Sequence, residues 1–138
     1  MYENYGMHEM KETDSIDVLI CVHSKTYKHD FLLNKALESL TRQTFKNFKV
    51  IIVMDECWEH TMHYVNVFQK KLIIEVHERK KKEGLAKAKN FGLSKCTADW
   101  VAYLDADDQW MDCKLEIQRN FMIKNPDIDF CFTGALVS

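Results

Sequence analysis

The chain of 138 residues has the length of one domain and can bury a hydrophobic core. Its 46% hydrophobic and 29% charged residues are ordinary for a globular protein, and a net charge of −2 gives no general reason to expect a nucleic-acid partner. The sequence holds neither an apolar run of the roughly 20 residues that span a bilayer nor the apolar centre of a signal peptide, so it predicts a cytoplasmic protein without a membrane segment.

Residues 1–14 are polar and are expected to form a flexible arm in front of a single domain over residues 15–138. The five cysteines are odd in number, widely spaced and without a C-x-x-C pair. Reduced thiols are therefore expected instead of a disulfide framework.

Short apolar runs alternate with helical patterns along the chain. Strands are expected at residues 16–22, 50–54, 72–76, 100–104 and 130–133. Helices are expected from an N-cap at Asp30, and over about 61–70, 84–94 and 114–124, the last of which ends before Pro126. The alternation predicts an α/β fold with a mostly parallel, doubly wound, Rossmann-like sheet flanked by helices. Side chains predicted to lie in the core include Leu33, Ala36, Leu37, Leu40, Phe31, Phe45, Phe48, Leu115, Met122 and the stem of Arg119.

An acidic turn follows the fourth predicted strand, with Asp105, Asp107 and Asp108 within four residues. Clustered like charges cost free energy unless a cation lies among them, although aspartate is also common in plain turns. Polar residues also follow the first two strands, at His23-Ser24 and Asp55-Glu56. The carboxyl ends of parallel strands share one edge of a sheet, where α/β proteins bind ligands. This edge is the candidate site.

Five segments carry a family resemblance in their order and spacing. They are residues 15–23 (SIDVLICVH), 37–45 (LESLTRQTF), 48–55 (FKVIIVMD), 84–93 (GLAKAKNFGL) and 104–110 (LDADDQW). Together they resemble the nucleotide-sugar-binding half of the family-2 glycosyltransferases of GT-A fold. The resemblance implies a GT-A-like domain that binds a UDP-sugar and transfers the sugar, with inversion, to a saccharide or other hydroxyl acceptor.

The resemblance also assigns roles to residues. Asp55 would hold the base, since a carboxylate accepts a charge-assisted hydrogen bond from an imide N–H. Asp105 and Asp107 would form the D-x-D motif, and Asp107 with Asp108 would contact the ribose and a divalent cation, Mn²⁺ or Mg²⁺. Cations from the basic loop and the following helix would lie near the diphosphate. The full set of expected donor-binding residues is Val22, His23, Asp55, Lys82, Gly84, Lys89, Asp105, Ala106 and Asp107, with Asp107 and Asp108 on the metal.

Some positions depart from the family pattern. Met54 precedes Asp55 where many members have two acids, and Lys89 replaces an arginine, so the nucleotide and the sugar are left open. An inverting transfer needs a general base, and residues 109–138 offer no candidate, so the catalytic residue is unidentified. The acceptor-binding half of the family is accordingly expected to be lacking. The alternative is a non-catalytic nucleotide-sugar-binding module or fragment; a phosphate-accepting domain with Mg²⁺ leaves the segment at 84–93 unexplained.

Other features have simpler readings. Cys57, His60 and His63 have ligand-like spacing, but a zinc site lacks a fourth ligand there. The basic run 80–82 is either a solvated loop or a phosphate contact, and His23 is either a loop residue or part of a base pocket. Trp100 and Trp110 are expected to pack.

Overall fold

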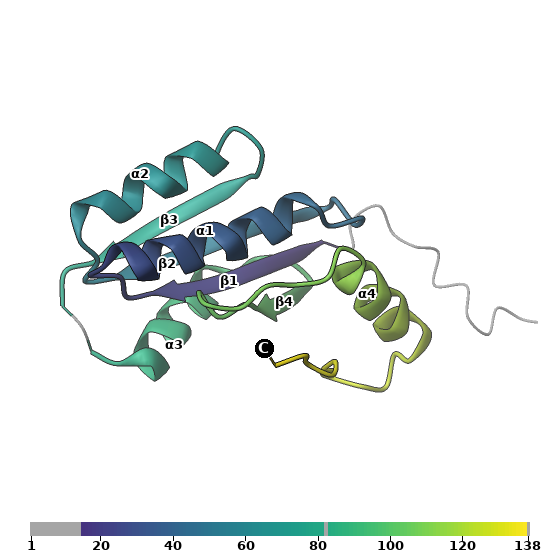
Figure 1. The fold of residues 1–138 in the computed structure, drawn as a ribbon. Coiled ribbons are helices and arrows are strands. Elements are labelled where there is room, and N and C mark those ends of the chain that lie inside the picture. Colours follow the sequence, from purple (N-terminus) through teal and green to yellow (C-terminus); the bar gives the residue numbers. More distant parts are fainter. Residues whose placement is uncertain (1–14, 82, 138) are drawn as a thin grey trace, which may run out of the picture.

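The computed structural model describes residues 15–81 and 83–137, so the expected arm at 1–14 and Lys82 lie outside the described residues. The described chain forms one parallel four-stranded sheet with helices on both faces, in the strand order β3-β2-β1-β4 (Figure 1). The predicted α/β, parallel, doubly wound fold is confirmed. The elements are β1 (Ile16–Val22), α1 (Tyr27–Thr41), β2 (Phe48–Asp55), α2 (Glu59–Phe68), β3 (Ile74–Arg79), α3 (Leu85–Lys95), β4 (Trp100–Tyr103) and α4 (Lys114–Lys124).

Both faces of the central strands β1 and β2 are buried, which explains why they appear as nearly continuous apolar runs. Val18 and Ile20 belong to the core under α1 and α2, while Leu19 belongs to the core under α3. Figure 1 shows α1 and α2 on one side of the sheet and α3 on the other. Helix α3 approaches so closely that a Cβ on Gly92 would lie 2.9 Å from Val53 Cγ2.

The order of the strands creates a switch point. From β1 the chain adds β2 and then β3 on one side, and β4 then pairs with the other edge of β1. The turns after β1 and β4 therefore start from neighbouring strands. Such a switch is where open α/β sheets leave a crevice for ligands.

The predicted fifth strand is wrong. Residues 130–133 have no regular structure, and Phe130 and Phe132 are 77% and 87% exposed. A strand needs a partner for its backbone groups, whereas this segment is held by a side chain of α4, since Gln118 Nε2 lies 3.5 Å from Cys131 Sγ.

The start of α1 also differs from its prediction. Its N-cap is Thr26, whose hydroxyl accepts a hydrogen bond from the His29 N–H, and Asp30 is a buried residue of the first turn. Phe31 is exposed and not part of the core, whereas Phe48 is buried and Phe45 packs against the core.

Helix α4 has its predicted bounds, and Leu115, Arg119 and Met122 are buried as expected. Strand β3 begins and ends later than predicted, because Leu72 still donates its N–H to Phe68 O at the end of α2. None of the helices in the described ranges is long and apolar enough to cross a membrane.

Candidate functional site

The turns after β1 and β2 meet at the carboxyl edge of the sheet. His23 Nδ1 lies 2.9 Å from the backbone oxygen of Asp55, and the Trp58 N–H donates to the backbone oxygen of Ser24 at 3.0 Å. Val22 ends β1 as a buried residue, whereas the His23 side chain is exposed. Sequence reasoning expected these turns to converge, and the described contacts join them.

Asp55 ends β2 with a buried carboxylate. Within the described residues, its Oδ1 atom accepts no hydrogen bond. Arg79 is its register partner at the end of β3, so both side chains leave the same face of the sheet. The Nη1 atom of Arg79 is likewise buried and, in the described part of the chain, without a hydrogen-bond partner. A buried acceptor and a buried donor without partners are uncommon in folded proteins and call for a ligand or water that satisfies them.

The Arg79 guanidinium is held in place by two neighbours. Its Nη2 atom donates to Glu83 Oε2 at 3.1 Å, and its central carbon lies 5.3 Å from the ring centre of Phe91 in α3. These contacts leave Nη1 as the donor that faces away from the Glu83 ion pair, and they restrict the rotamers of the side chain. Arg79 is therefore pre-organised at the edge.

The Cys21 side chain lies near several charged groups of this edge. Burial is the largest influence on this thiol and raises its pKa; the charges of Lys89, Asp55, Asp105 and Arg79 follow. These four groups come from α3, β2, the turn after β4, and β3. The acidic turn and the Asp55 edge therefore belong to one electrostatic neighbourhood.

The acidic turn itself is closed by the Asp108 N–H, which donates to the backbone oxygen of Asp105 at 3.0 Å. Asp105 forms an ion pair with Lys89 Nζ at 3.7 Å, while Asp107 and Asp108 are exposed and Ala106 packs against the core. Burial, followed by the neighbouring carboxylates of Asp107 and Asp105, raises the pKa of Asp108. A cation at the turn would relieve this repulsion.

The acidic turn fits one kind of metal site. No group of three or more His, Cys, Asp or Glu side chains in the described ranges is placed to hold a metal ion. A cage made of protein ligands alone is therefore not formed. Mg²⁺ and Mn²⁺ also bind through one or two carboxylates completed by phosphate oxygens and water, and Asp107 with Asp108 supplies that donor set.

The weaker zinc hypothesis finds no support in the contacts. Cys57 Sγ lies 3.3 Å from the backbone oxygen of Val22, and the His60 ring stacks edge-on against Trp58 at 4.8 Å between centroids. Both side chains are thus engaged in packing the turn after β2.

The loop before α3 is exposed at Lys80 and Lys81, and Lys82 lies outside the described residues. Gly84 is the N-cap of α3 with φ of 98°, a left-handed conformation that favours glycine. This explains the glycine at the start of the 84–93 segment.

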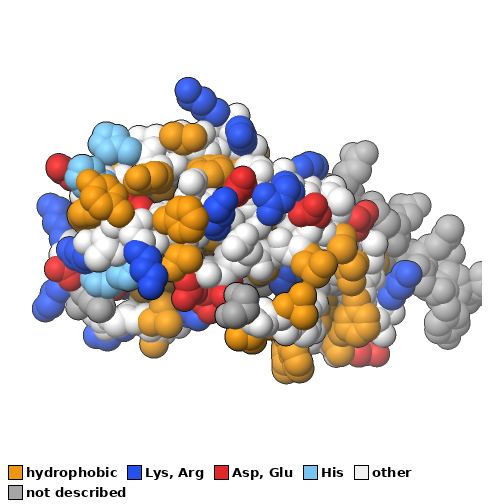
Figure 2. Space-filling view, viewed as in Figure 1, with side chains coloured by type: hydrophobic (Ala, Val, Ile, Leu, Met, Phe, Trp, Pro, Cys, Tyr) orange, Lys and Arg blue, Asp and Glu red, His pale blue; other side chains and the backbone are white. Residues whose placement is uncertain are grey.

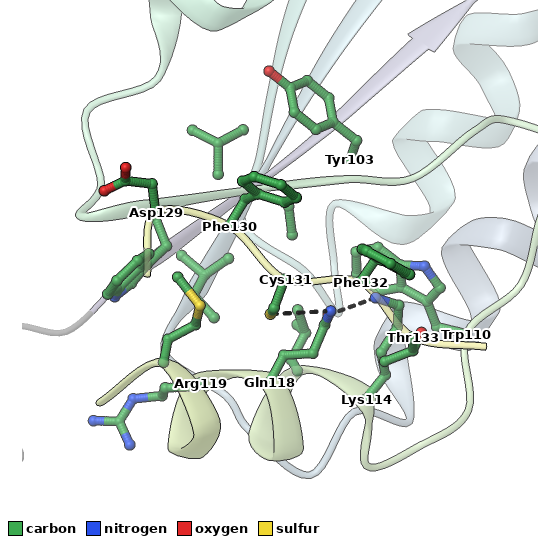
Figure 3. A pocket seen from close by; sticks show the side chains of 16 residues that line it. Tyr103, Trp110, Lys114, Gln118, Arg119, Asp129, Phe130, Cys131, Phe132 and Thr133 are labelled. Atoms are coloured by element: carbon green, nitrogen blue, oxygen red, sulfur yellow. Dashed lines mark hydrogen bonds between the residues drawn. The ribbon is translucent and has the colours of Figure 1, made fainter. Parts of the chain in front are cut away.

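A cavity of about 550 Å³ lies elsewhere, between the outer edge of β4, α4 and residues 129–133 (Figure 3). Trp100 and Trp110 line it, and Lys114 Nζ lies 4.6 Å from the Trp110 ring centre. In Figure 2 hydrophobic side chains gather over this end of the molecule. None of the predicted donor residues lines this cavity.

Sequence reasoning missed Arg79, because the third predicted strand ended at residue 76. The signal lies in the alternation of β3, where Glu75, His77 and Arg79 share one face and Ile74 and Val76 share the other. Extending that period-two pattern puts Arg79 on the strand, on the same face as Glu75 and His77.

Solved structures of known enzymes share this architecture. Residues 1–349 of S. aureus TarS, solved in complex with UDP-GlcNAc, match with a TM-score of 0.70 at 24% identity, over 78% of this chain and 31% of that chain. The mannosyltransferase PcManGT from Pyrobaculum calidifontis, solved with GDP-Man and Mn²⁺, matches with a TM-score of 0.69 at 19% identity, over 78% of this chain and 32% of that one. The fold is that of these GT-A enzymes.

Sequence comparison gives the family. An Escherichia coli protein named UDP-Glc:alpha-D-GlcNAc-diphosphoundecaprenol beta-1,3-glucosyltransferase WfgD is 28% identical over 116 residues, which are 84% of this chain and 45% of that protein. The chain spans less than half the length of the first curated relatives that it matches. The profile of Glycosyl transferase family 2 matches residues 18–136, and the chain belongs to this family.

Proposed function

We propose that residues 15–138 form the donor-binding domain of an inverting glycosyltransferase that uses a UDP-sugar and a divalent cation. The observation that carries the proposal is the buried Asp55 carboxylate beside Arg79, each with a polar atom that lacks a hydrogen bond within the described residues. The TarS complex with UDP-GlcNAc and the relative named for UDP-Glc support a uridine nucleotide.

The base would bind at the ends of β2 and β3. Asp55 Oδ1 accepts the imide N–H of uracil, and a charged acceptor makes this hydrogen bond strong. Arg79 Nη1 donates to a carbonyl oxygen of the same ring. Val22, His23 and Gly84 would line the same end of the site.

The diphosphate would bind at the acidic turn. Asp107 and Asp108 would hold the cation, which would offset the negative charge of the UDP leaving group. Asp105 and Ala106 keep the turn in place, because Asp105 accepts the Asp108 N–H and Ala106 packs on the core. Lys89, already paired with Asp105 at 3.7 Å, adds positive charge next to the same phosphates, with Lys82 expected nearby.

The acceptor would be a saccharide or another hydroxyl compound, and its deprotonation requires a general base. Asp127 and Asp129 are exposed and lie beyond α4, and neither is assigned that role.

A comparison of the affinities for three nucleotides tests the proposal. With Mn²⁺ present, the dissociation constants of UDP, CDP and GDP are measured for the wild type and for Asp55→Asn, with Asp112→Asn as the control. Asp112 is an exposed acid that pairs with Arg42 at 3.3 Å. UDP is expected to bind tightest, and Asp55→Asn to weaken it about tenfold or more, as for a lost hydrogen bond to a charged group. Equal binding of UDP by wild type and Asp55→Asn would overturn the assignment.

A further inference from the structure

Asp30 is a fully buried carboxylate outside the proposed nucleotide contacts. It accepts three side-chain hydrogen bonds: from Ser24 Oγ at 2.6 Å and Thr61 Oγ1 at 2.8 Å on Oδ1, and from Trp58 Nε1 at 2.8 Å on Oδ2. Burying a carboxylate costs several kcal/mol of hydration, and hydrogen bonds to the charged group offset that cost. The three hydrogen bonds therefore stabilise the Asp30 carboxylate in its buried position.

The three donors come from two different turns. Ser24 belongs to the turn after β1, while Trp58 and Thr61 belong to the N-cap and first turn of α2, directly after β2. Asp30 sits in the first turn of α1 and contacts both. One carboxylate therefore joins the two turns that lead away from Val22 and Asp55.

Further contacts connect the two turns to Asp55. Ser24 donates its N–H to Cys57 Sγ at 3.4 Å, and Ser24 O accepts the Trp58 N–H at 3.0 Å. One residue earlier, His23 Nδ1 lies 2.9 Å from Asp55 O. The chain of contacts thus runs from Asp30 through Ser24 and His23 to Asp55.

We propose that Asp30 is a positioning residue for the base-binding part of the donor site. It fixes the turns after β1 and β2 to each other, so that His23 and Asp55 are held in place before the nucleotide arrives. The proposal rests on the proposed function. Pre-organisation of this kind raises affinity because the ligand does not have to order the turns itself.

Two substitutions weaken the connection while keeping the packing. Thr61→Val removes one hydrogen bond to Asp30 at nearly constant shape. Trp58→Phe removes the indole N–H but keeps an aromatic ring against Tyr27 and His60, whose ring centres lie 4.8 Å from that of Trp58. The matched control is Thr41→Val in the last turn of α1, where the hydroxyl donates only to the local Glu38 O at 2.7 Å.

Calorimetry with uridine and with UDP, each with and without Mn²⁺, measures the positioning effect. Thr61→Val and Trp58→Phe are expected to raise the dissociation constants of uridine and UDP by a similar factor, about five- to tenfold, at unchanged stoichiometry. The gain in UDP affinity on adding Mn²⁺ is expected to stay as in the wild type, because it depends on the acidic turn. Partial unfolding would lower the stoichiometry instead.

Hydrogen exchange measures the connection without a nucleotide. The Ser24 and Trp58 amides are expected to exchange faster in both variants than in the wild type and in Thr41→Val, while amides of β4 are unchanged. Variants that bind uridine as the wild type does, or that leave these amides protected, overturn the positioning role. A wild type that binds neither uridine nor UDP overturns the proposed function, and the positioning role with it.

Discussion

Asp55 and Arg79 are register partners at the carboxyl ends of β2 and β3, and each holds a buried polar atom that makes no hydrogen bond within the described residues. An unsatisfied buried polar group costs about 1–3 kcal/mol of stability, so two such groups at paired strand ends favour a ligand that satisfies both. A ligand that offers a donor to Asp55 and an acceptor to Arg79 regains that free energy.

A substitution of Arg79 tests whether this residue binds the nucleotide together with Asp55. Arg79→Gln is expected to raise the dissociation constant of UDP about tenfold or more, since it removes a charged donor from the proposed base site. The control is Arg42→Gln, an exposed arginine that pairs with Asp112 at 3.3 Å and Glu38 at 4.0 Å. Fluorescence or calorimetric titration with UDP gives both constants. Equal losses in the two variants would show that Arg79 has no specific role.

Gly92 tests how tightly α3 packs on the sheet. In Gly92→Ala the new Cβ would lie 2.9 Å from Val53 Cγ2 and still closer to Leu19 Cδ1, both in a buried core. Alanine gains up to about 1 kcal/mol in helix propensity, but overpacking costs about 1–3 kcal/mol, so we expect a net loss of about 1–2 kcal/mol. Urea unfolding measures it.

The matched control is Gly134→Ala, where nothing lies within 4 Å of the added Cβ. Its free energy of unfolding is expected to stay within about 0.5 kcal/mol of the wild type. A Gly92→Ala variant as stable as the wild type would mean that α3 lies farther from the sheet.

Cys96 gives a pH dependence of stability. Burial, with a smaller contribution from Asp17, raises the pKa of its thiol to about 11, and in the unfolded chain a thiol has a pKa near about 8.5–9. Between these values the unfolded chain releases a proton that the folded chain keeps. The contribution of Cys96 to stability is therefore complete below about pH 8.5 and is lost as the pH rises to about 11.

Urea unfolding of the wild type and of Cys96→Ser at several pH values between 8 and 11 checks the sign. The serine variant keeps a donor for Gly92 O, which Cys96 Sγ contacts at 3.4 Å, but its residue 96 no longer titrates in this range. Its stability is expected to fall less steeply with pH than that of the wild type. Parallel pH profiles would contradict a raised pKa of the Cys96 thiol.

Much of the fold was predictable because the relevant signals are local. The apolar runs of β1 and β2 reflect burial on both faces of the sheet, and α4 was bounded by its periodicity and by Pro126. The position of Asp55 and of the acidic turn followed from the rule that strand ends share an edge.

The parts that failed depend on tertiary contacts. Phe130 and Phe132 have strand-forming side chains, but a strand also needs a neighbour, and the segment lies against α4. Aspartate is a residue type typical of N-caps, but the buried Asp30 carboxylate instead accepts hydrogen bonds from residues 24, 58 and 61. Arg79 reaches Asp55 only through the register of β2 with β3, which no local pattern specifies.

The cation at the acidic turn is the central claim, and calorimetry of UDP binding with and without Mn²⁺ tests it most directly. The wild type is compared with the double variant Asp107→Ala, Asp108→Ala. Mn²⁺ is expected to tighten UDP binding to the wild type at least about tenfold, and to have no effect on the variant, which loses both carboxylates. The account would be contradicted if the wild type bound UDP equally well with and without Mn²⁺ and the double variant bound UDP as tightly as the wild type.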